Sequence, residues 1–267
     1  MKLGIIGTGR MAQAIVGGIL KDRSLAPDQI TGTDPNEVSK TSFLNLSFGE
    51  PLQWADSIGS LVNNQDAILL AVKPQNIDEI LPIVANSPET TTVISIAAGV
   101  SLTKLQDHLG ETRPVIRVMP NTPLLVGNGV VAWCGNDHIA TPQKEMIAVL
   151  FGGVAEVHQV AESEMDAVTA LSGSGPAFFY RIIQYLEAAA VAEGLHPDRA
   201  RALATGTAAG AVKMLQSTGL EPDELVAQVR SKGGTTEAGL NVLESGEAQT
   251  MLTKTIAAAA RRSRELG

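Results

Sequence analysis

The first part of the chain alternates short apolar runs with segments of helical periodicity. Apolar runs that predict buried strands lie at residues 3–6, 29–33, 66–71, 92–96, 115–118, 129–133 and 155–160. Apolar residues at helical spacing predict helices that begin near Met11, pass through 77–84, follow a cap at Ser101 to Leu109, and run over 141–151. Strands that alternate with helices are typical of a doubly wound parallel sheet, so we expect an α/β fold here.

The pattern changes near residue 160. From Ser163 onward, Ala-rich helical periodicity replaces the strand pattern, and a glycine- and serine-rich segment at 171–176 interrupts it. We therefore predict two domains, an α/β domain over residues 1–160 and an all-helical domain over residues 161–267.

Large side chains are scarce in the helical part. Helices are expected to begin with Pro176 and near Asp198 and to run over 248–265, and Gly194 is expected to end the first of them. Aromatic residues make up only 3% of the whole chain, and Ala and Gly dominate these helices. Because such a bundle has little core of its own, we expect it to share a core with a second copy in an obligate homodimer.

The turn after the first strand has the residues of a nucleotide site. Gly7, Gly9 and Ala12 form the spacing G-x-G-x-x-A between a strand and a helix that carries Ile15 and Ile19. Gly7 permits the tight turn, Gly9 lets backbone amides approach a pyrophosphate, and Ala12 lets the helix pack closely on the strand. The positive end of the helix then faces the phosphates. We therefore predict a Rossmann-type, dinucleotide-binding domain rather than a plain tight turn.

The end of the second predicted strand bears on the choice of cofactor. Asp34 would accept hydrogen bonds from the adenosine ribose and repel a 2′-phosphate, which favours NAD. Thr33, Asn36 and Lys40 are close enough in sequence to bind or neutralise a phosphate instead. Asp34 also suits a plain turn before a proline. The choice between NADH and NADPH therefore stays open.

Three other segments follow predicted strands at the same edge of the sheet. Lys73 either points into the crevice where such sheets bind ligands or is a solvated loop lysine. The small residues Ala97 and Ala98 leave room for a flat group such as a nicotinamide ring. Asn121 lies in a loop that two prolines stiffen, and it is either a site residue or a structural turn residue.

A second anion site is predicted in the helical part, at 231–239. The adjacent Gly233 and Gly234 free the backbone to aim consecutive N–H groups at one point, and a helix follows. Such a turn can hold a carboxylate. The hydroxyls of Thr235 and Thr236 either contact the ligand or only cap the helix.

Composition narrows the function further. A net charge of −8 argues against nucleic acid or an anionic membrane as the main partner. The single cysteine excludes an internal disulfide and a Cys-cluster metal site, and the four histidines lack ligand spacing and are expected on the surface or in loops, so no metal is expected. No apolar run reaches about 18 residues and the first strand follows the N-terminus directly, so we expect a soluble, cytoplasmic protein without a signal peptide.

Several segments together closely resemble pyrroline-5-carboxylate reductase over nearly the whole chain. They are the N-terminal fingerprint and residues 72–74, 117–123, 166–169, 172–177 and, most specifically, 231–244. The resemblance implies reduction of the cyclic imine Δ1-pyrroline-5-carboxylate to L-proline by NADPH or NADH, the last step of proline biosynthesis. It also implies a C-terminal domain that binds substrate and dimerises, with dimers that often assemble into a decamer, a pentamer of dimers.

The resemblance implies roles for individual residues as well. Cofactor contacts fall on Ile6, Gly7, Thr8, Gly9, Arg10, Met11, Thr33, Asp34, Asn36, Ala71, Val72, Lys73, Pro74, Ala97 and Ala98. Substrate contacts fall on Asn121, Glu162, Ser231, Gly233, Gly234, Thr235 and Thr236. The Thr236 hydroxyl is the candidate catalytic group, which either relays a proton to the imine nitrogen or only orients the imine. Lys232, where many members have proline, and Asp34, where members that prefer NADPH often lack an acid, depart from the family pattern.

Two other functions stay open. One is a related two-domain reductase of another imine or of a hydroxy acid, for which Lys213, Lys232 and Lys254 are the candidate acid/base lysines. The other is a non-catalytic NAD(P) sensor, against which the intact anion site at 231–236 argues, because a sensor needs no substrate carboxylate site.

Overall fold

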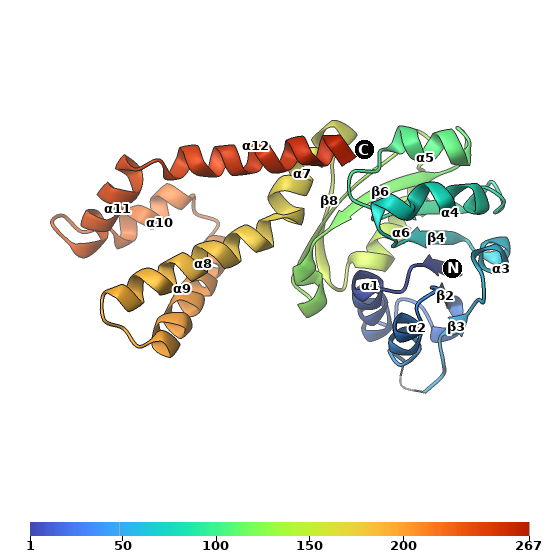
Figure 1. Cartoon of the computed structure of the whole chain (residues 1–267), viewed down its shortest axis with the longest axis horizontal. Helices are drawn as coiled ribbons and strands as arrows, with labels where there is room; N and C mark the ends of the chain where they lie inside the picture. Colours follow the sequence, from blue (N-terminus) through green and yellow to red (C-terminus); the bar gives the residue numbers. More distant parts are fainter. Residues whose placement is uncertain (48, 267) are drawn as a thin grey trace. The chain divides into compact units, whose positions relative to one another are not determined.

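The computed structural model describes residues 1–47 and 49–266, and its packing divides the chain into two units (Figure 1). Unit 1 comprises Met1–Ser174 together with Ala258–Gly267, and unit 2 comprises Gly175–Ala257. The domain boundary expected after residue 160 stays a prediction, since packing and sequence character need not change at the same residue.

Within the described residues, unit 1 is built on an eight-stranded sheet of order β3-β2-β1-β4-β5-β6-β7-β8. The strands are β1 (Leu3–Ile6), β2 (Ile30–Thr33), β3 (Gln53–Trp54), β4 (Ala67–Leu70), β5 (Thr92–Ser95), β6 (Val115–Pro120), β7 (Gly129–Gly135) and β8 (Ala155–Gln159). The apolar runs identified every strand except β3, whose two residues are too few to form a run. The α/β fold with a Rossmann-type arrangement is therefore confirmed.

The sheet is mixed rather than wholly parallel. Strands β1 to β6 pair in parallel, but β7 runs antiparallel to β6, and β8 runs parallel to β7. The cause is the short link between β6 and β7, which holds only a 3-10 turn, Thr122–Val126. A parallel crossover needs about a dozen or more residues, so this link can only reverse the chain.

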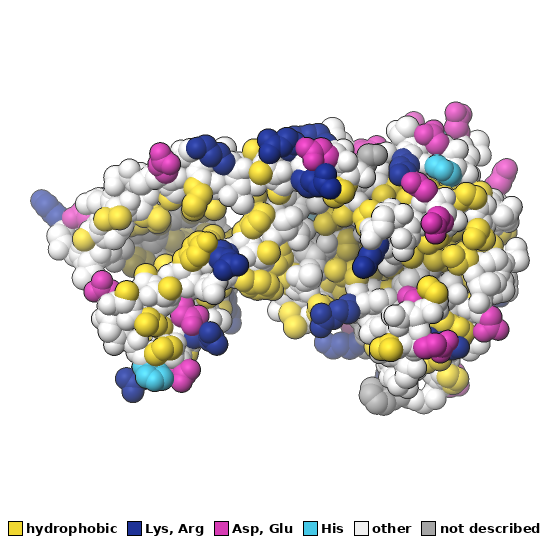
Figure 2. Space-filling view, viewed as in Figure 1, with side chains coloured by type: hydrophobic (Ala, Val, Ile, Leu, Met, Phe, Trp, Pro, Cys, Tyr) yellow, Lys and Arg dark blue, Asp and Glu magenta, His cyan; other side chains and the backbone are white. Residues whose placement is uncertain are grey.

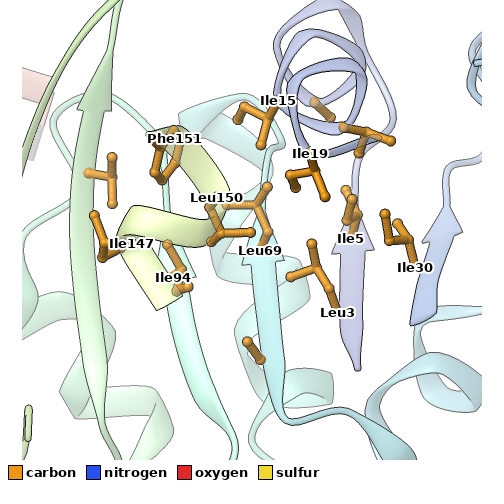
Figure 3. Packing of buried hydrophobic residues seen from close by; sticks show 14 of the residues in the cluster. Leu3, Ile5, Ile15, Ile19, Ile30, Leu69, Ile94, Ile147, Leu150 and Phe151 are labelled. Carbon is orange, nitrogen blue, oxygen red and sulfur yellow. The ribbon is translucent and has the colours of Figure 1, made fainter. Parts of the chain in front are cut away.

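Helices cover both faces of the sheet. On one face, α1 (Arg10–Lys21) and α6 (Thr141–Phe151) bury Ile15, Ile19, Leu150 and Phe151 against strand residues such as Ile5 (Figure 3). On the other face, α4 (Ile77–Val84) and α5 (Leu102–Leu109) pack against the alternate strand residues. The period-2 alternation along each strand divides the apolar side chains between these two cores. Both cores together hold the carboxyl ends of the strands in place.

The remaining helices of unit 1 are short. They are α2 (Glu37–Leu44), α3 (Ile58–Leu61) and α7 (Met165–Val168). The segment at 171–176 was expected to interrupt the helical pattern, and the α-helix does break in this region, since α7 ends at Val168 and the next α-helix begins at Gly175. Residues Thr169–Gly173 form a π-helical turn, in which the Ser174 N–H donates to the Thr169 carbonyl at 2.9 Å.

Unit 2 contains the helices α8 (Gly175–Ala192), α9 (Pro197–Thr218), α10 (Pro222–Val229) and α11 (Thr235–Ser245), and it also contains the start of α12 (Ala248–Leu266). Of its described residues only Gly175 and Ala200 are buried, whereas Phe179 and Tyr185 are each 62% exposed and Val242 is 73% exposed. Figure 2 shows hydrophobic side chains open to solvent over this unit. The expected lack of an internal core is therefore confirmed. No helix among the described residues has the length and apolar character needed to cross a bilayer.

Candidate functional site

A cleft of about 590 Å³ opens at the carboxyl ends of β1, β2 and β4. In the sheet, β2 and β3 lie on one side of β1, and β4 and the later strands lie on the other side. Doubly wound sheets bind nucleotides at such a point, where the strand order reverses. Among the expected cofactor residues, the wall includes Ile6, Gly7, Gly9, Thr33, Asp34, Asn36, Ala71, Val72 and Lys73. It does not include Thr8, Arg10, Met11, Pro74, Ala97 and Ala98, whose roles stay predictions like the others.

The two glycines of the turn differ in what they require. Gly7 has a φ of +91°, and a Cβ on it would lie 2.8 Å from the Ala71 carbonyl oxygen, so the fold itself needs glycine there. A Cβ on Gly9 would meet no protein atom within 4 Å. Gly9 is the N-cap of α1 and supplies no side-chain cap, which leaves the amides of the first turn free for an anion. The turn therefore fits a bound pyrophosphate.

The Asp34 carboxylate joins the glycine turn to the loop after β2. Its Oδ2 accepts the Thr8 N–H at 2.8 Å, and its Oδ1 accepts the Asn36 N–H at 2.8 Å. Asn36 in turn caps α2, because its Oδ1 accepts the N–H groups of Val38 and Ser39. Asp34 is thus a structural turn residue in the wall of the cleft. It retains free lone pairs for a ribose hydroxyl.

Lys73, expected in the ligand crevice or in solvent, and Lys40, suggested for a phosphate contact, lie in different places. Lys73 is exposed at the wall of the cleft. Lys40 is not part of this wall, since its Nζ lies over the Trp54 ring, 5.3 Å from the ring centre, and 3.9 Å from Glu37. Cation–π attraction and the ion pair hold it there. The structure therefore gives Lys40 a position away from the cleft.

Asn121 and Glu162 both have internal partners in unit 1. Asn121 is 7% exposed; its Oδ1 accepts the Val130 N–H at 2.9 Å and its Nδ2 donates to Ser172 at 3.3 Å. This pattern favours the structural reading of Asn121. Glu162 accepts the Leu102 N–H at 2.6 Å. Substrate contact by either side chain stays a prediction.

The glycine turn of unit 2 already holds a carboxylate, that of Glu237. The Gly233 N–H donates to Glu237 Oε2 at 2.8 Å, and Glu237 Oε1 lies 3.6 Å from Arg230 Nε. The Gly234 N–H donates to the Ser231 carbonyl at 3.0 Å. Both glycine amides therefore have acceptors within the chain, and their contacts with substrate stay a prediction. The turn binds a carboxylate as expected, but from its own chain.

The first turn of α11 carries the two threonines. Gly234 is the N-cap of this helix, so neither threonine caps it. The amides of Thr235 and Thr236 belong to the first turn and have no acceptor within the helix. Thr236 is half-buried and lines an apolar hollow of about 420 Å³ whose other walls include Met214, Val226 and Leu240. A hydroxyl, unpaired amides and apolar walls are thus close together in unit 2.

Neither the cleft of unit 1 nor the apolar hollow of unit 2 has a histidine or a cysteine among its described lining residues. The four histidines, His108, His138, His158 and His196, are exposed, as expected. Cys134 lies in β7, where burial, and then the negative charge of Glu162, raises the pKa of its thiol to about 11. Within the part of the chain that the structure describes, no group of His, Cys, Asp and Glu side chains is placed to hold a metal ion.

Unit 1 also contains a polar cluster in which only Glu162 was expected to be a site residue. Arg117 in β6 lies between Glu162 and Asp166, and Asp166 also binds Ser263 near the end of α12. The one available signal was an arginine within an otherwise apolar predicted strand. The sequence does not indicate that Ser263 belongs to this cluster, because Ser263 and Asp166 are far apart in the chain and only folding brings them together.

Comparisons with known proteins agree with this geometry. Residues 162–266 match the family described as pyrroline-5-carboxylate reductase dimerisation, and residues 2–99 match the family described as coenzyme F420-dependent NADP oxidoreductase. The pyrroline-5-carboxylate reductase of Synechocystis is 36% identical over 267 residues, which cover 100% of this chain and 98% of that protein.

Solved structures match over the same length. A pyrroline-5-carboxylate reductase from Coxiella burnetii has a TM-score of 0.90 at 31% identity, with 100% of this chain and 98% of that chain covered. The pyrroline carboxylate reductase of Plasmodium falciparum, solved with NADP bound, has a TM-score of 0.87 at 29% identity and the same coverage.

Proposed function

Because this chain belongs to the pyrroline-5-carboxylate reductase family, we propose that it reduces Δ1-pyrroline-5-carboxylate to L-proline as an NAD(P)H-dependent oxidoreductase. This reaction is the last step of proline biosynthesis. One observation in the structure carries the proposal: a glycine turn that binds a carboxylate lies directly before Thr236, in a chain that also has a dinucleotide cleft. The substrate has the matching groups, a carboxylate and a C=N bond in one small ring.

The cofactor site is proposed in the cleft of unit 1. The space beside Gly9 and the uncapped start of α1 fit a pyrophosphate. When bound, the nicotinamide cofactor supplies a hydride. The negative charge of Asp34 favours NADH, whereas Asn36 and Ser39 in the same wall offer hydrogen-bond donors for the 2′-phosphate of NADPH. The proposal therefore covers both cofactors, and their relative use is measurable.

The substrate site is proposed at the start of α11. The amides of Thr235 and Thr236, which have no acceptor within the helix, would bind the substrate carboxylate, and Gly233 would join them once Glu237 releases its N–H group. The Thr236 hydroxyl would then orient the imine nitrogen and donate a hydrogen bond to it. Fixing the ring in this way can contribute several kcal/mol, on the order of 7–11 in the best cases, so positioning is the main catalytic term.

We also propose that the chain acts as a homodimer, that dimers assemble into a decamer, and that the protein is cytoplasmic. The dimer is supported by the large exposed side chains of unit 2, such as Phe179 and Tyr185, and by the match to a dimerisation family. A cytoplasmic location fits the single free cysteine, which is buried.

The decisive experiment is oxidation of NADPH, and separately of NADH, by the purified protein with and without pyrroline-5-carboxylate. Oxidation that depends on the imine is the expected result. Folded, dimeric protein that oxidises neither cofactor with this imine would overturn the proposal. Turnover with another imine or with a hydroxy acid would instead identify the related reductase.

A further inference from the structure

Arg117 is a buried cation that lies between two carboxylates of unit 1. It is 6% exposed, its Nη1 lies 3.3 Å from Glu162 Oε1, and its Nη2 lies 4.0 Å from Asp166 Oδ1. The strand register pairs Arg117 with Ser95, the last residue of β5. Burying an ion pair costs desolvation energy that hydrophobic side chains of similar size would not cost. Stability alone is therefore a weak explanation for this cluster.

Both carboxylates also bind segments that flank the turn after β5, residues 97–100. Glu162 Oε1 accepts the N–H of Leu102, the first residue of α5. Asp166 Oδ1 accepts the hydroxyl of Ser263 in α12 at 2.7 Å, and Ser263 is 3% exposed. Arg117 thus connects the start of α5 to the end of α12 through two carboxylates.

The end of α12 packs directly on this turn. Gly99 has a φ of +81°, and a Cβ on it would lie 2.9 Å from Leu266 Cβ and 3.3 Å from the Ser263 carbonyl oxygen. Any displacement of the turn toward α12 would meet these atoms. At the start of the turn, the Ala97 N–H donates to Ser95 Oγ at 3.3 Å. Hydrogen bonds near both ends of the turn and the packing of α12 against Gly99 therefore fix its position.

We propose that Arg117 is a positioning residue for the nicotinamide end of the cofactor, which it holds in place by fixing the turn at residues 97–100 through Glu162 and Asp166. This inference rests on the proposed function and on the expectation from the sequence that Ala97 and Ala98 lie against the nicotinamide ring. In this proposal Arg117, which is buried, acts only through its two carboxylate partners. Its effect follows from geometry, because a shift of about 1 Å in a reacting group can cost roughly 100-fold in rate.

Arg113 provides a matched control on the same segment of chain. It is 2% exposed, and its guanidinium donates to the carbonyls of Ala85, Ser87, Pro88 and Leu109 and to Ser87 Oγ. These partners lie before β5 and at the end of α5, near the amino ends of the strands, whereas the turn at 97–100 follows the carboxyl end of β5. Loss of Arg113 therefore tests what burial of an arginine contributes to stability alone.

The experiment compares Arg117→Lys, Arg113→Lys and Ser263→Ala in the full-length protein. The measurements are the thermal midpoint, the dissociation constant of NAD(P)H without substrate by fluorescence, kcat with KM for both substrates, and the isotope effect with 4-deuterated cofactor. Both lysine variants are expected to melt earlier. Arg117→Lys is expected to lower kcat roughly 10- to 100-fold, with a larger isotope effect and weaker cofactor binding. Arg113→Lys is expected to keep these values within about twofold of the wild type.

The proposal would be overturned if Arg117→Lys bound cofactor and turned over as the wild type does. It would also be overturned if Arg113→Lys lost as much activity as Arg117→Lys. Ser263→Ala removes one hydrogen bond and is expected to fold, so it keeps the test valid if Arg117→Lys does not fold. It is expected to change cofactor binding and kcat in the direction of Arg117→Lys but less, and no change in either would contradict the inference. Failure of the proposed function is distinguishable, because it abolishes imine-dependent oxidation in the wild type and leaves the cofactor titrations intact.

Discussion

The Glu237 carboxylate accepts the Gly233 N–H at 2.8 Å, so the turn proposed for the substrate carboxylate is occupied by a carboxylate of the same helix. Substrate that uses the Gly233 amide must therefore displace Glu237 toward solvent or toward Arg230, whose Nε lies 3.6 Å away. The side chain of Glu237 is 31% exposed, and this makes such a movement feasible. The internal contact competes with substrate at the same hydrogen-bond donor.

Glu237→Gln is expected to lower the KM for pyrroline-5-carboxylate about two- to fivefold and to leave kcat unchanged. A neutral amide binds the Gly233 N–H less strongly than a carboxylate does, and the difference is reduced by solvent at this exposure. Steady-state kinetics at saturating cofactor measures the change. Glu244→Gln, near the end of the same helix, is the control and should match the wild type. A higher KM in Glu237→Gln would show that Glu237 instead holds the turn in its binding conformation.

Thr236→Ala is expected to lower kcat roughly 10- to 100-fold and to spare the affinity for cofactor. The physical reason is the loss of one hydrogen bond that is made to the imine nitrogen as it becomes an amine. Thr236→Ser keeps the hydroxyl and should retain most of the activity. Full activity of the alanine variant in a steady-state assay would remove Thr236 from the mechanism.

Asp34→Asn is expected to raise the ratio of kcat/KM for NADPH over NADH by about tenfold. The substitution removes one negative charge near the proposed 2′-phosphate, and a charge repulsion of about 1 kcal/mol or more accounts for this factor. Both values of kcat/KM should fall, because the carboxylate also holds the Thr8 and Asn36 amides. Lys40→Met is a suitable control, since Lys40 lies over Trp54 and should leave the ratio unchanged.

Stability is expected to decrease between about pH 9 and pH 11 through Cys134. Burial raises the pKa of this thiol from 9.0 to about 11, so the folded protein keeps a proton that the unfolded chain releases in this interval. Because the unfolded state binds fewer protons there, the free energy of unfolding falls as pH rises. Urea unfolding of wild type and Cys134→Ala at pH 8 and pH 10 isolates the effect from that of other groups. Equal pH dependence in the two proteins would contradict it.

The midpoint of urea unfolding is expected to rise with protein concentration. Unit 2 buries only Gly175 and Ala200 among its described residues. In the proposed homodimer a second copy would complete its core, and dimerisation would then stabilise the fold by mass action. Unfolding curves over a hundredfold range of concentration, with sedimentation velocity on the same samples, provide the measurement. A folded monomer with a constant midpoint would argue against the obligate dimer.

Local patterns in the sequence predicted most of the sheet and the cofactor turn. The motif marked Gly7 correctly, although the atoms that exclude a side chain there belong to Ala71 and Val72, which follow β4 and not β1. The reversal at β7 was missed because it depends on the length of the link after Asn121 rather than on the apolar run of β7 itself. Short elements such as β3 leave no period to detect.

The partners of polar side chains were much less predictable. The glycine turn was recognised from Gly233 and Gly234, but the carboxylate that fills it comes from Glu237, which sequence spacing alone presents as an ordinary residue in the first turn of a helix. The contact between Asp166 and Ser263 joins residues 97 positions apart. Such contacts form only when the whole chain has folded, so the local spacing of residues cannot predict them.

The end of α12 belongs to unit 1, although unit 2 lies between it and the rest of that unit along the chain. A ribosome that has translated as far as Ala257 has therefore made all of unit 2 but not all of unit 1. The turn at residues 97–100 receives its supporting contacts from Ser263 and Leu266 only when these residues leave the exit tunnel. Unit 1 is synthesised first, but it cannot complete its packing until all of unit 2, the part proposed to pair with another copy, has been made.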